Sequence, residues 1–130
     1  MKILIVEDEA LVAMAMESYL AGAGHTVVGQ ADDFDTAVTL AEATRPDLAL
    51  VDINLVDGDS GVDVASQLNK QSVPCLIVTS NCNPHRQLDG AVGCLQKPVN
   101  QSILVQAVAV ARRKVRGLPV GDVPRGLALY

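Results

Sequence analysis

The sequence has very few aromatic residues: no tryptophan, two tyrosines and one phenylalanine among 130 residues. A core built on large aromatic side chains is therefore excluded, although 49% of the residues are hydrophobic and only 19% are charged. A chain of this length and composition folds as about one globular domain and is not disordered. Its core must consist of valine, leucine, isoleucine and alanine, which suits a parallel sheet buried by helices on both faces.

Long apolar segments are also absent. No stretch could span a bilayer, and the apolar run at the N-terminus ends at Glu7, too early for a signal peptide. We therefore expect a cytoplasmic protein that does not bind membranes. The net charge of −5 argues against direct binding to nucleic acid. The basic residues at 112–116 are interpreted as the cationic end of a helix, where they complement the helix dipole.

Cysteines are scarce and lack the close spacing of a metal site. Cys75, Cys82 and Cys94 are odd in number, and we expect them to be reduced, structural thiols. The sequence contains no phosphate-binding loop, no dinucleotide fingerprint and no nucleophile elbow. These absences argue against the common classes of nucleotide-binding and hydrolytic enzymes.

Short apolar segments alternate with helical patterns along the chain. Strands are predicted at 2–6, 26–30, 48–53, 75–79 and 92–96. Helices are predicted at about 12–23, 35–43, 62–68 and 101–114. This alternation predicts an α/β fold, with a five-stranded parallel sheet flanked by helices on both faces. Residues 1–116 would form this domain, and residues 117–130, which contain several glycines and prolines, a flexible C-terminal tail.

Chemically active side chains follow the ends of four predicted strands. In chain order they are Glu7 with Asp8, Asp52, Thr79 and Lys97. Ligands of such folds bind at the carboxyl ends of the strands, so we expect these groups to converge there. Three neighbouring carboxylates repel one another and need a cation. Mg²⁺ fits, because it prefers one or two carboxylates together with water and phosphate oxygens.

Four motifs, in order and at strand ends, resemble the receiver domain of response regulators from two-component systems. They are Ile5-Val6-Glu7-Asp8-Glu9, Val51-Asp52-Ile53-Asn54, Val78-Thr79-Ser80 and Gln96-Lys97-Pro98. Each motif alone is weak evidence, but together they are specific, and the similarity covers roughly residues 1–115. The resemblance implies a flavodoxin-like doubly wound fold. It also implies Mg²⁺-dependent phosphoryl transfer from a histidine kinase or a histidine phosphotransfer protein.

The resemblance assigns the phosphoryl acceptor and the metal ligands. Asp52 corresponds to the acceptor, whose carboxylate forms an aspartyl phosphate. Glu7 and Asp8 correspond to the acidic pair that holds Mg²⁺, with Asp52 and the backbone carbonyl of Asn54 as further ligands.

The remaining roles concern the phosphoryl group. Lys97 would pair with a phosphoryl oxygen, Thr79 would close onto the group, and the amide of Ser80 could approach it. Asn54 and Asn81 resemble positions that tune the phosphoryl lifetime. The peptide bond before Pro98 is often cis in this family.

The sequence departs from the family at two places. Receivers usually carry an aromatic residue three positions before the lysine, and this aromatic side chain swings inward as the threonine moves. Here that position is Cys94. The interval between Thr79 and Lys97 is also too short for a full fourth helix, so 84–88 is expected to form only a turn or two. These departures leave phosphorylation intact and leave the output route open.

Several functional alternatives remain at this point. The main one is a pseudo-receiver that binds partners without phosphorylation. A hydrolase with an aspartyl-phosphate intermediate ranks lower, because Asn54 stands where a general acid would be needed. The leading interpretation is a signalling domain and not an enzyme, since it catalyses only its own phosphorylation and dephosphorylation. The stimulus, the kinase and the target are not encoded in any motif.

The predicted last helix raises a separate question about partners. It is apolar on almost every side between residues 103 and 111, more than one buried face needs. We expect part of it to contact a downstream regulator or a second copy in a homodimer. Small residues tolerated on an exposed face are the alternative.

Overall fold

The computed structural model describes residues 1–83 and 85–130. In chain order its elements are β1 (Lys2–Val6), α1 (Ala10–Gly22), β2 (Thr26–Ala31), α2 (Phe34–Thr44), β3 (Leu48–Val51), α3 (Gly61–Lys70), β4 (Cys75–Thr79), β5 (Ala91–Gln96), α4 (Gln101–Val115) and β6 (Leu127–Leu129). The strands form one sheet in the order β2-β1-β3-β4-β5-β6. The first five strands are parallel, and β6 runs antiparallel to β5.

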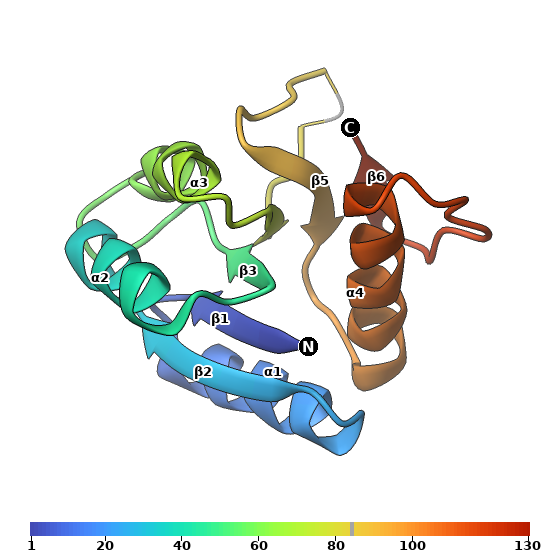
Figure 1. The fold of residues 1–130 in the computed structure, drawn as a ribbon, viewed down its shortest axis with the longest axis horizontal. Coiled ribbons are helices and arrows are strands. Elements are labelled where there is room, and N and C mark those ends of the chain that lie inside the picture. Colours follow the sequence, from blue (N-terminus) through green and yellow to red (C-terminus); the bar gives the residue numbers. More distant parts are fainter. Residues whose placement is uncertain (84) are drawn as a thin grey trace.

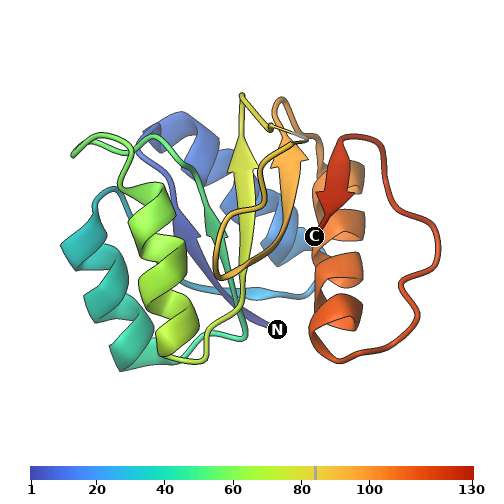
Figure 2. The ribbon, with the colours of Figure 1, turned by 90° about the horizontal axis from the view of Figure 1, so that it is seen from above.

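Helices cover both faces of the sheet (Figures 1 and 2). α1 and α4 lie on one face, and α2 and α3 on the other. In β1, Ile3 and Ile5 belong to the core under α1 and α4, while Leu4 and Val6 belong to the core under α2 and α3. This alternation follows from the two-residue period of a strand. Among the described residues, no helix combines the length and the apolar character needed to cross a bilayer.

The structure confirms the α/β fold and the elements predicted from the sequence, with shifts of one or two residues at most ends. β3 ends at Val51, two residues before the predicted end. Arg45 leaves right-handed helical geometry ahead of Pro46, as expected from the following proline, and adopts the left-handed conformation with φ of 48°. The peptide bond between Lys97 and Pro98 is cis, as predicted.

The predicted count of five strands is wrong, because the sheet has a sixth strand. Residues 127–129, which were expected to belong to a flexible tail, pair with β5 along its outer edge. Leu127 is buried in the same core as Val108 of α4. Gly93 of β5 makes the close approach possible, since a Cβ atom at this position would lie 2.6 Å from the carbonyl oxygen of Ala128. The segment 127–129 is too short to show the alternating pattern of a strand, so the sequence did not predict β6.

The connection between β4 and β5 contains no helix in its described part, residues 80–83 and 85–90. The turn or two predicted at 84–88 includes Pro84, which lies outside the described residues. Cys82 in this connection forms a disulfide with Cys94 of β5, with Cα atoms 6.0 Å apart. The expectation of three reduced thiols is therefore corrected, and Cys75 is the free, buried cysteine. The sequence could not reveal the pair, because only the fold brings the loop back to β5.

Candidate functional site

The chemically active side chains meet at the carboxyl ends of the parallel strands because of the strand register. β1 and β3 pair Val6 with Val51, so the next residues, Glu7 and Asp52, emerge side by side. The amide of Asp52 donates to the carbonyl of Val6 over 2.9 Å, which continues the strand pairing to the acceptor position. The convergence expected from the sequence is therefore a direct result of in-register parallel pairing.

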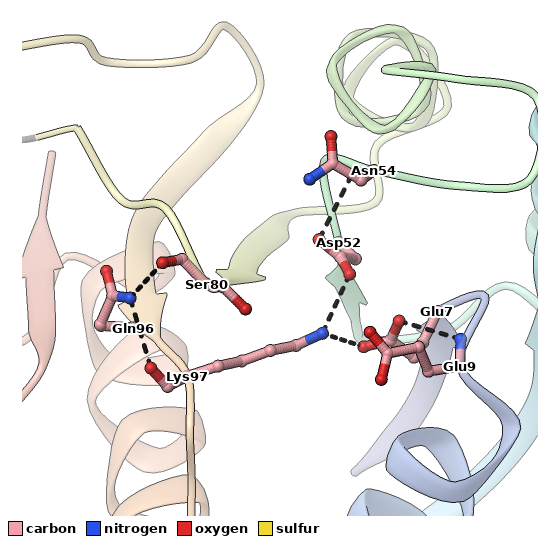
Figure 3. A network of polar contacts seen from close by, with 7 residues as sticks. All are labelled: Glu7, Glu9, Asp52, Asn54, Ser80, Gln96 and Lys97. Carbon is pink, nitrogen blue, oxygen red and sulfur yellow. Dashed lines mark hydrogen bonds and ion pairs between the residues drawn. The ribbon is translucent and has the colours of Figure 1, made fainter.

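Lys97 joins this group from β5 in the same way. Its amide donates to the carbonyl of Thr79 over 2.9 Å, so its backbone is held at the end of β4. Figure 3 shows its side chain reaching across the site, where the ammonium contacts both Glu7 and Asp52. The bond from its Nζ to Oδ2 of Asp52 measures 2.9 Å.

The ion pairs lie in a largely buried environment. Glu7 is 4% exposed and Asp52 is 6% exposed. Buried carboxylates without partners would be costly, and here one ammonium compensates two of them. The cluster therefore retains an excess of negative charge, which favours a second cation.

Burial controls the protonation of the cluster. It raises the pKa of Glu7 to about 7, and the charge of Asp52 acts in the same direction, while the hydrogen bonds from Lys97 and the Glu9 amide oppose it. Burial alone would lower the pKa of Lys97. The hydrogen bonds to Glu7 and Asp52 outweigh that effect, so the pKa of Lys97 is raised and the ammonium stays charged at neutral pH.

The carboxylates also form a set that suits a divalent ion. Glu7, Asp8 and Asp52 each offer an oxygen atom, and these atoms all lie within 4.8 Å of one another. Hard oxygen ligands in this arrangement fit Mg²⁺. Asn54 lies at the same rim, where its backbone amide donates a hydrogen bond to Oδ1 of Asp52 over 3.3 Å. Its carbonyl as a metal ligand stays a prediction.

Thr79 and Ser80 end β4 in different environments. Thr79 is 1% exposed, and its hydroxyl has no hydrogen-bond partner among the described residues. Ser80 is exposed, and its carbonyl accepts a hydrogen bond from the side chain of Gln96 (Figure 3). The structure therefore brings the predicted residues to one rim, with a buried hydroxyl that still lacks an acceptor.

Two residues that support the site were not singled out from the sequence. A Cβ atom on Gly61 would lie 1.9 Å from the carbonyl oxygen of Asp52, so only glycine lets α3 begin this close to the acceptor. Gln96 holds the loop after β4, since its side chain donates to Ser80 and accepts from the amide of Cys82. A glycine opening a predicted helix was the available signal for Gly61, whereas Gln96 gave none.

Comparisons with known proteins agree with this geometry. The family model of the response regulator receiver domain matches residues 3–109. The phyllosphere-induced regulator PhyR of Methylorubrum extorquens is 45% identical over 91 residues, which cover 68% of this chain and 33% of PhyR. The transcriptional regulatory protein PdtaR of Mycobacterium tuberculosis is 36% identical over 120 residues, which cover 88% of this chain and 58% of PdtaR. The chain thus spans less than two thirds of either relative.

A solved structure extends the comparison to three dimensions. The signal receiver domain of a modulated diguanylate cyclase from Desulfovibrio desulfuricans G20 superposes with a TM-score of 0.76 at 31% identity. The match covers 88% of this chain and 95% of that domain. The fold described above is therefore that of a known receiver domain over most of the chain.

Proposed function

Because this chain belongs to the response regulator receiver domain family, we propose that it accepts a phosphoryl group on Asp52 and signals by altered protein binding. The donor would be a histidine kinase or a histidine phosphotransfer protein, and the recipient of the signal a downstream regulator. The observation that carries the proposal is the cluster in which Asp52 lies beside Glu7 and Asp8, in contact with Lys97.

The transfer step assigns a task to each of these groups. A carboxylate oxygen of Asp52 forms a bond to phosphorus while the bond between phosphorus and the donor's imidazole nitrogen breaks, and the imidazole leaves and takes up a proton. Lys97 is within contact distance of Asp52 and would pair with a phosphoryl oxygen. The Thr79 hydroxyl would donate to another, which supplies its missing acceptor. The product is a modified signalling domain, so the chain is not a turnover enzyme.

The metal requirement follows from charge. Glu7, Asp8 and Asp52 would hold Mg²⁺, as their oxygen atoms allow. When bound, Mg²⁺ neutralises the charge between the carboxylate and the phosphoryl group and orients them for in-line transfer. The excess negative charge that Lys97 leaves uncompensated supports this assignment.

A surface next to the site suits the histidine donor. A mainly apolar groove of about 570 Å³ is lined by Leu11, Val12, Ala15 and Met16 of α1 together with Ser80, Lys97, Pro98 and Val99. Leu11 is 80% exposed at the side of this groove and adds to the apolar surface that a partner could cover. Since the groove shares Lys97 with the acceptor site, a donor seated there would bring its phosphohistidine to Asp52. Its apolar lining fits a donor helix with an apolar face.

The test uses a small phosphoryl donor and does not need the cognate kinase. The protein is incubated with acetyl phosphate and Mg²⁺, and its intact mass is measured. We expect one added phosphoryl group that hydroxylamine removes, that disappears in Asp52→Asn and that persists in Asp35→Asn, an exposed acid on α2. Chelation of Mg²⁺ should abolish it. An adduct that persists in Asp52→Asn would refute the assignment of the acceptor.

The second candidate function is a pseudo-receiver that binds its partner without phosphorylation. Two observations favour it: Cys94 replaces the usual aromatic residue, and the described part of the connection between β4 and β5 has no helix. Absence of any adduct with acetyl phosphate at all Mg²⁺ concentrations would support this candidate over the first.

A further inference from the structure

A cavity of about 220 Å³ connects the acceptor site with the C-terminus of the chain. Its lining includes Asn54 and Thr79 from the site, Leu88 and Cys94, and the last residue, Tyr130. The small Cys94 side chain leaves space on this side of β5, and its sulfur is held by Cys82. Thr79 and Tyr130, 51 positions apart by their numbers, therefore line one pocket that is partly open to solvent.

Thr79 has a physical reason to move within this space. Its hydroxyl is buried and has no partner among the described residues, a state that is energetically unfavourable. A phosphoryl group on Asp52 would bring strong acceptor oxygens to the same rim. The Thr79 side chain would then turn toward them and withdraw from the cavity.

Tyr130 is held at the opposite wall by the sixth strand. Its amide donates to the carbonyl of Val92 over 3.0 Å, one step beyond the pairing of Gly93 with Leu129. Because side chains alternate along a strand, Leu127 and Leu129 pack on the α1 and α4 side, while Tyr130 packs on the side of Leu88 and Cys94.

Tyr130 is only partly buried and lines the cavity, so an inward movement of its ring would remove more of it from water. Burial raises the pKa of its phenol above the ordinary value, against a backbone hydrogen bond at Leu88 and the charge of Arg86. The ring therefore already contacts the cavity wall.

We propose that Tyr130 is a positioning residue that reads the state of Asp52: when Thr79 turns toward a phosphoryl group, the Tyr130 ring enters the cavity and shifts β6 against β5. This inference rests on the proposed function. It assigns the output to β6. Tyr130, which follows β6, would take the place of the aromatic side chain that β5 lacks at Cys94. Partners would then detect β6 and the connection between β4 and β5.

The composition of the chain permits a direct test. The sequence has two tyrosines, Tyr19 and Tyr130, and no tryptophan. In the Tyr19→Phe variant the intrinsic fluorescence therefore comes from Tyr130 alone. The protein is treated with acetyl phosphate and Mg²⁺, the adduct is quantified by mass, and quenching by acrylamide is measured. We expect the quenching constant to fall by about half on phosphorylation, as the ring loses exposure. In a Thr79→Ala version compared at equal adduct occupancy, the change should be lost.

A second measurement uses the reciprocity of coupling. If phosphorylation favours the inward ring, removal of the ring must weaken binding of a phosphoryl mimic by the same factor. We expect the Kd of beryllofluoride with Mg²⁺ to rise about fivefold in Tyr130→Ala and to change much less in Tyr130→Phe. Leu129→Ala is the control for general loosening of β6, since its side chain packs on the other face of the sheet.

The outcomes separate this inference from the proposed function. An adduct on Asp52 with unchanged quenching overturns the role of Tyr130 and leaves phosphorylation in place. A beryllofluoride Kd that rises by the same factor in Leu129→Ala as in Tyr130→Ala, or that does not rise in either, has the same consequence. Absence of the adduct overturns the proposed function and this inference with it.

Discussion

At the scale of single residues, the site depends on charge balance in a buried environment. Lys97 contacts Glu7 and Asp52, and both carboxylates are almost fully buried. One ammonium between two carboxylates fixes their positions but does not balance the charge of the three acids, Glu7, Asp8 and Asp52, so the site still favours a divalent cation. Under the proposed function, the same lysine would hold the two carboxylates before the transfer and bind the phosphoryl group after it.

Substitution of Lys97 tests its part in the transfer. In Lys97→Gln the transition state loses its nearest ammonium, and we expect the rate of phosphorylation by acetyl phosphate to fall about 10²-fold. Lys70→Gln, at the exposed end of α3, is the matched control and should keep the original rate. Rates are measured from the intact mass over time, and equal rates in both variants would exclude the role.

Gly61 positions the backbone of the acceptor. In Gly61→Ala the new Cβ would overlap the carbonyl oxygen of Asp52, so either α3 or the end of β3 must move. We expect the free energy of unfolding to fall by about 1–3 kcal/mol and phosphorylation to slow. Gly22→Ala is the control, because its Cβ would meet only the mobile end of Gln101. Urea unfolding measures the free energy of unfolding of both variants. A Gly61→Ala protein as stable as the wild type would contradict the predicted overlap.

At the scale of elements, the connection between β4 and β5 is organised by cross-links and not by a helix within its described residues. The Cys82–Cys94 disulfide and the Gln96 side chain both tie this segment to β5. Ordering a loop costs conformational entropy, which a cross-link reduces by restricting the unfolded chain. The connection that follows Thr79, which is too short for a full helix, is thus anchored to β5 by these two cross-links.

Thiol counting tests this pairing. Burial raises the pKa of Cys75 to about 12, so its thiol should not react with a disulfide reagent in the folded protein at mildly alkaline pH. We expect one reactive thiol after unfolding without reductant, and three after unfolding with reductant. Cys82→Ser should release Cys94 and give two after unfolding without reductant. Three thiols after unfolding of the wild type without reductant would show that the pair is reduced.

At the scale of the whole molecule, β6 covers the outer edge of β5 and leaves a strand of only three residues at that edge of the sheet. An open edge strand presents unpaired backbone groups that favour aggregation, and β6 pairs with those of β5. The C-terminal segment also helps to cover α4, since Leu127 shares its core and Val120 packs against that core. Part of the apolar surplus that suggested a partner for the last helix is thus covered by the chain itself. A homodimer through α4 stays a prediction.

Removal of residues 117–130 tests whether this segment belongs to the domain. The truncated chain loses the buried Leu127 and the pairing with β5, and we expect the free energy of unfolding to fall by about 2–5 kcal/mol. Urea unfolding measures the loss, and size-exclusion chromatography measures self-association at the exposed edge. Ala128→Lys, which changes an exposed position of β6, is the control. Unchanged stability after truncation would restore the expected domain limit at residue 116.

Much of the fold and of the site was predictable because the signals are local. Runs such as Ile3–Val6 consist of apolar residues, and this composition predicts that they are buried. Residues such as Glu7 and Asp52 lie directly after these runs. Parallel pairing then brings these ends together without further information. Gly61 and Tyr130 were not predictable, because the importance of each depends on a contact with a distant segment.

Local sequence patterns were sufficient to predict the alternation of strands and helices, the two-sided burial of the sheet and the order of the carboxylates, the hydroxyl and the lysine. These follow from periodicity and from the position of polar residues at the ends of apolar segments. Only the tertiary structure decided the sixth strand, the Cys82–Cys94 pair and the cavity between Thr79 and Tyr130. Each of these joins residues that are separated along the chain, and long-range packing has no signature in a single local pattern.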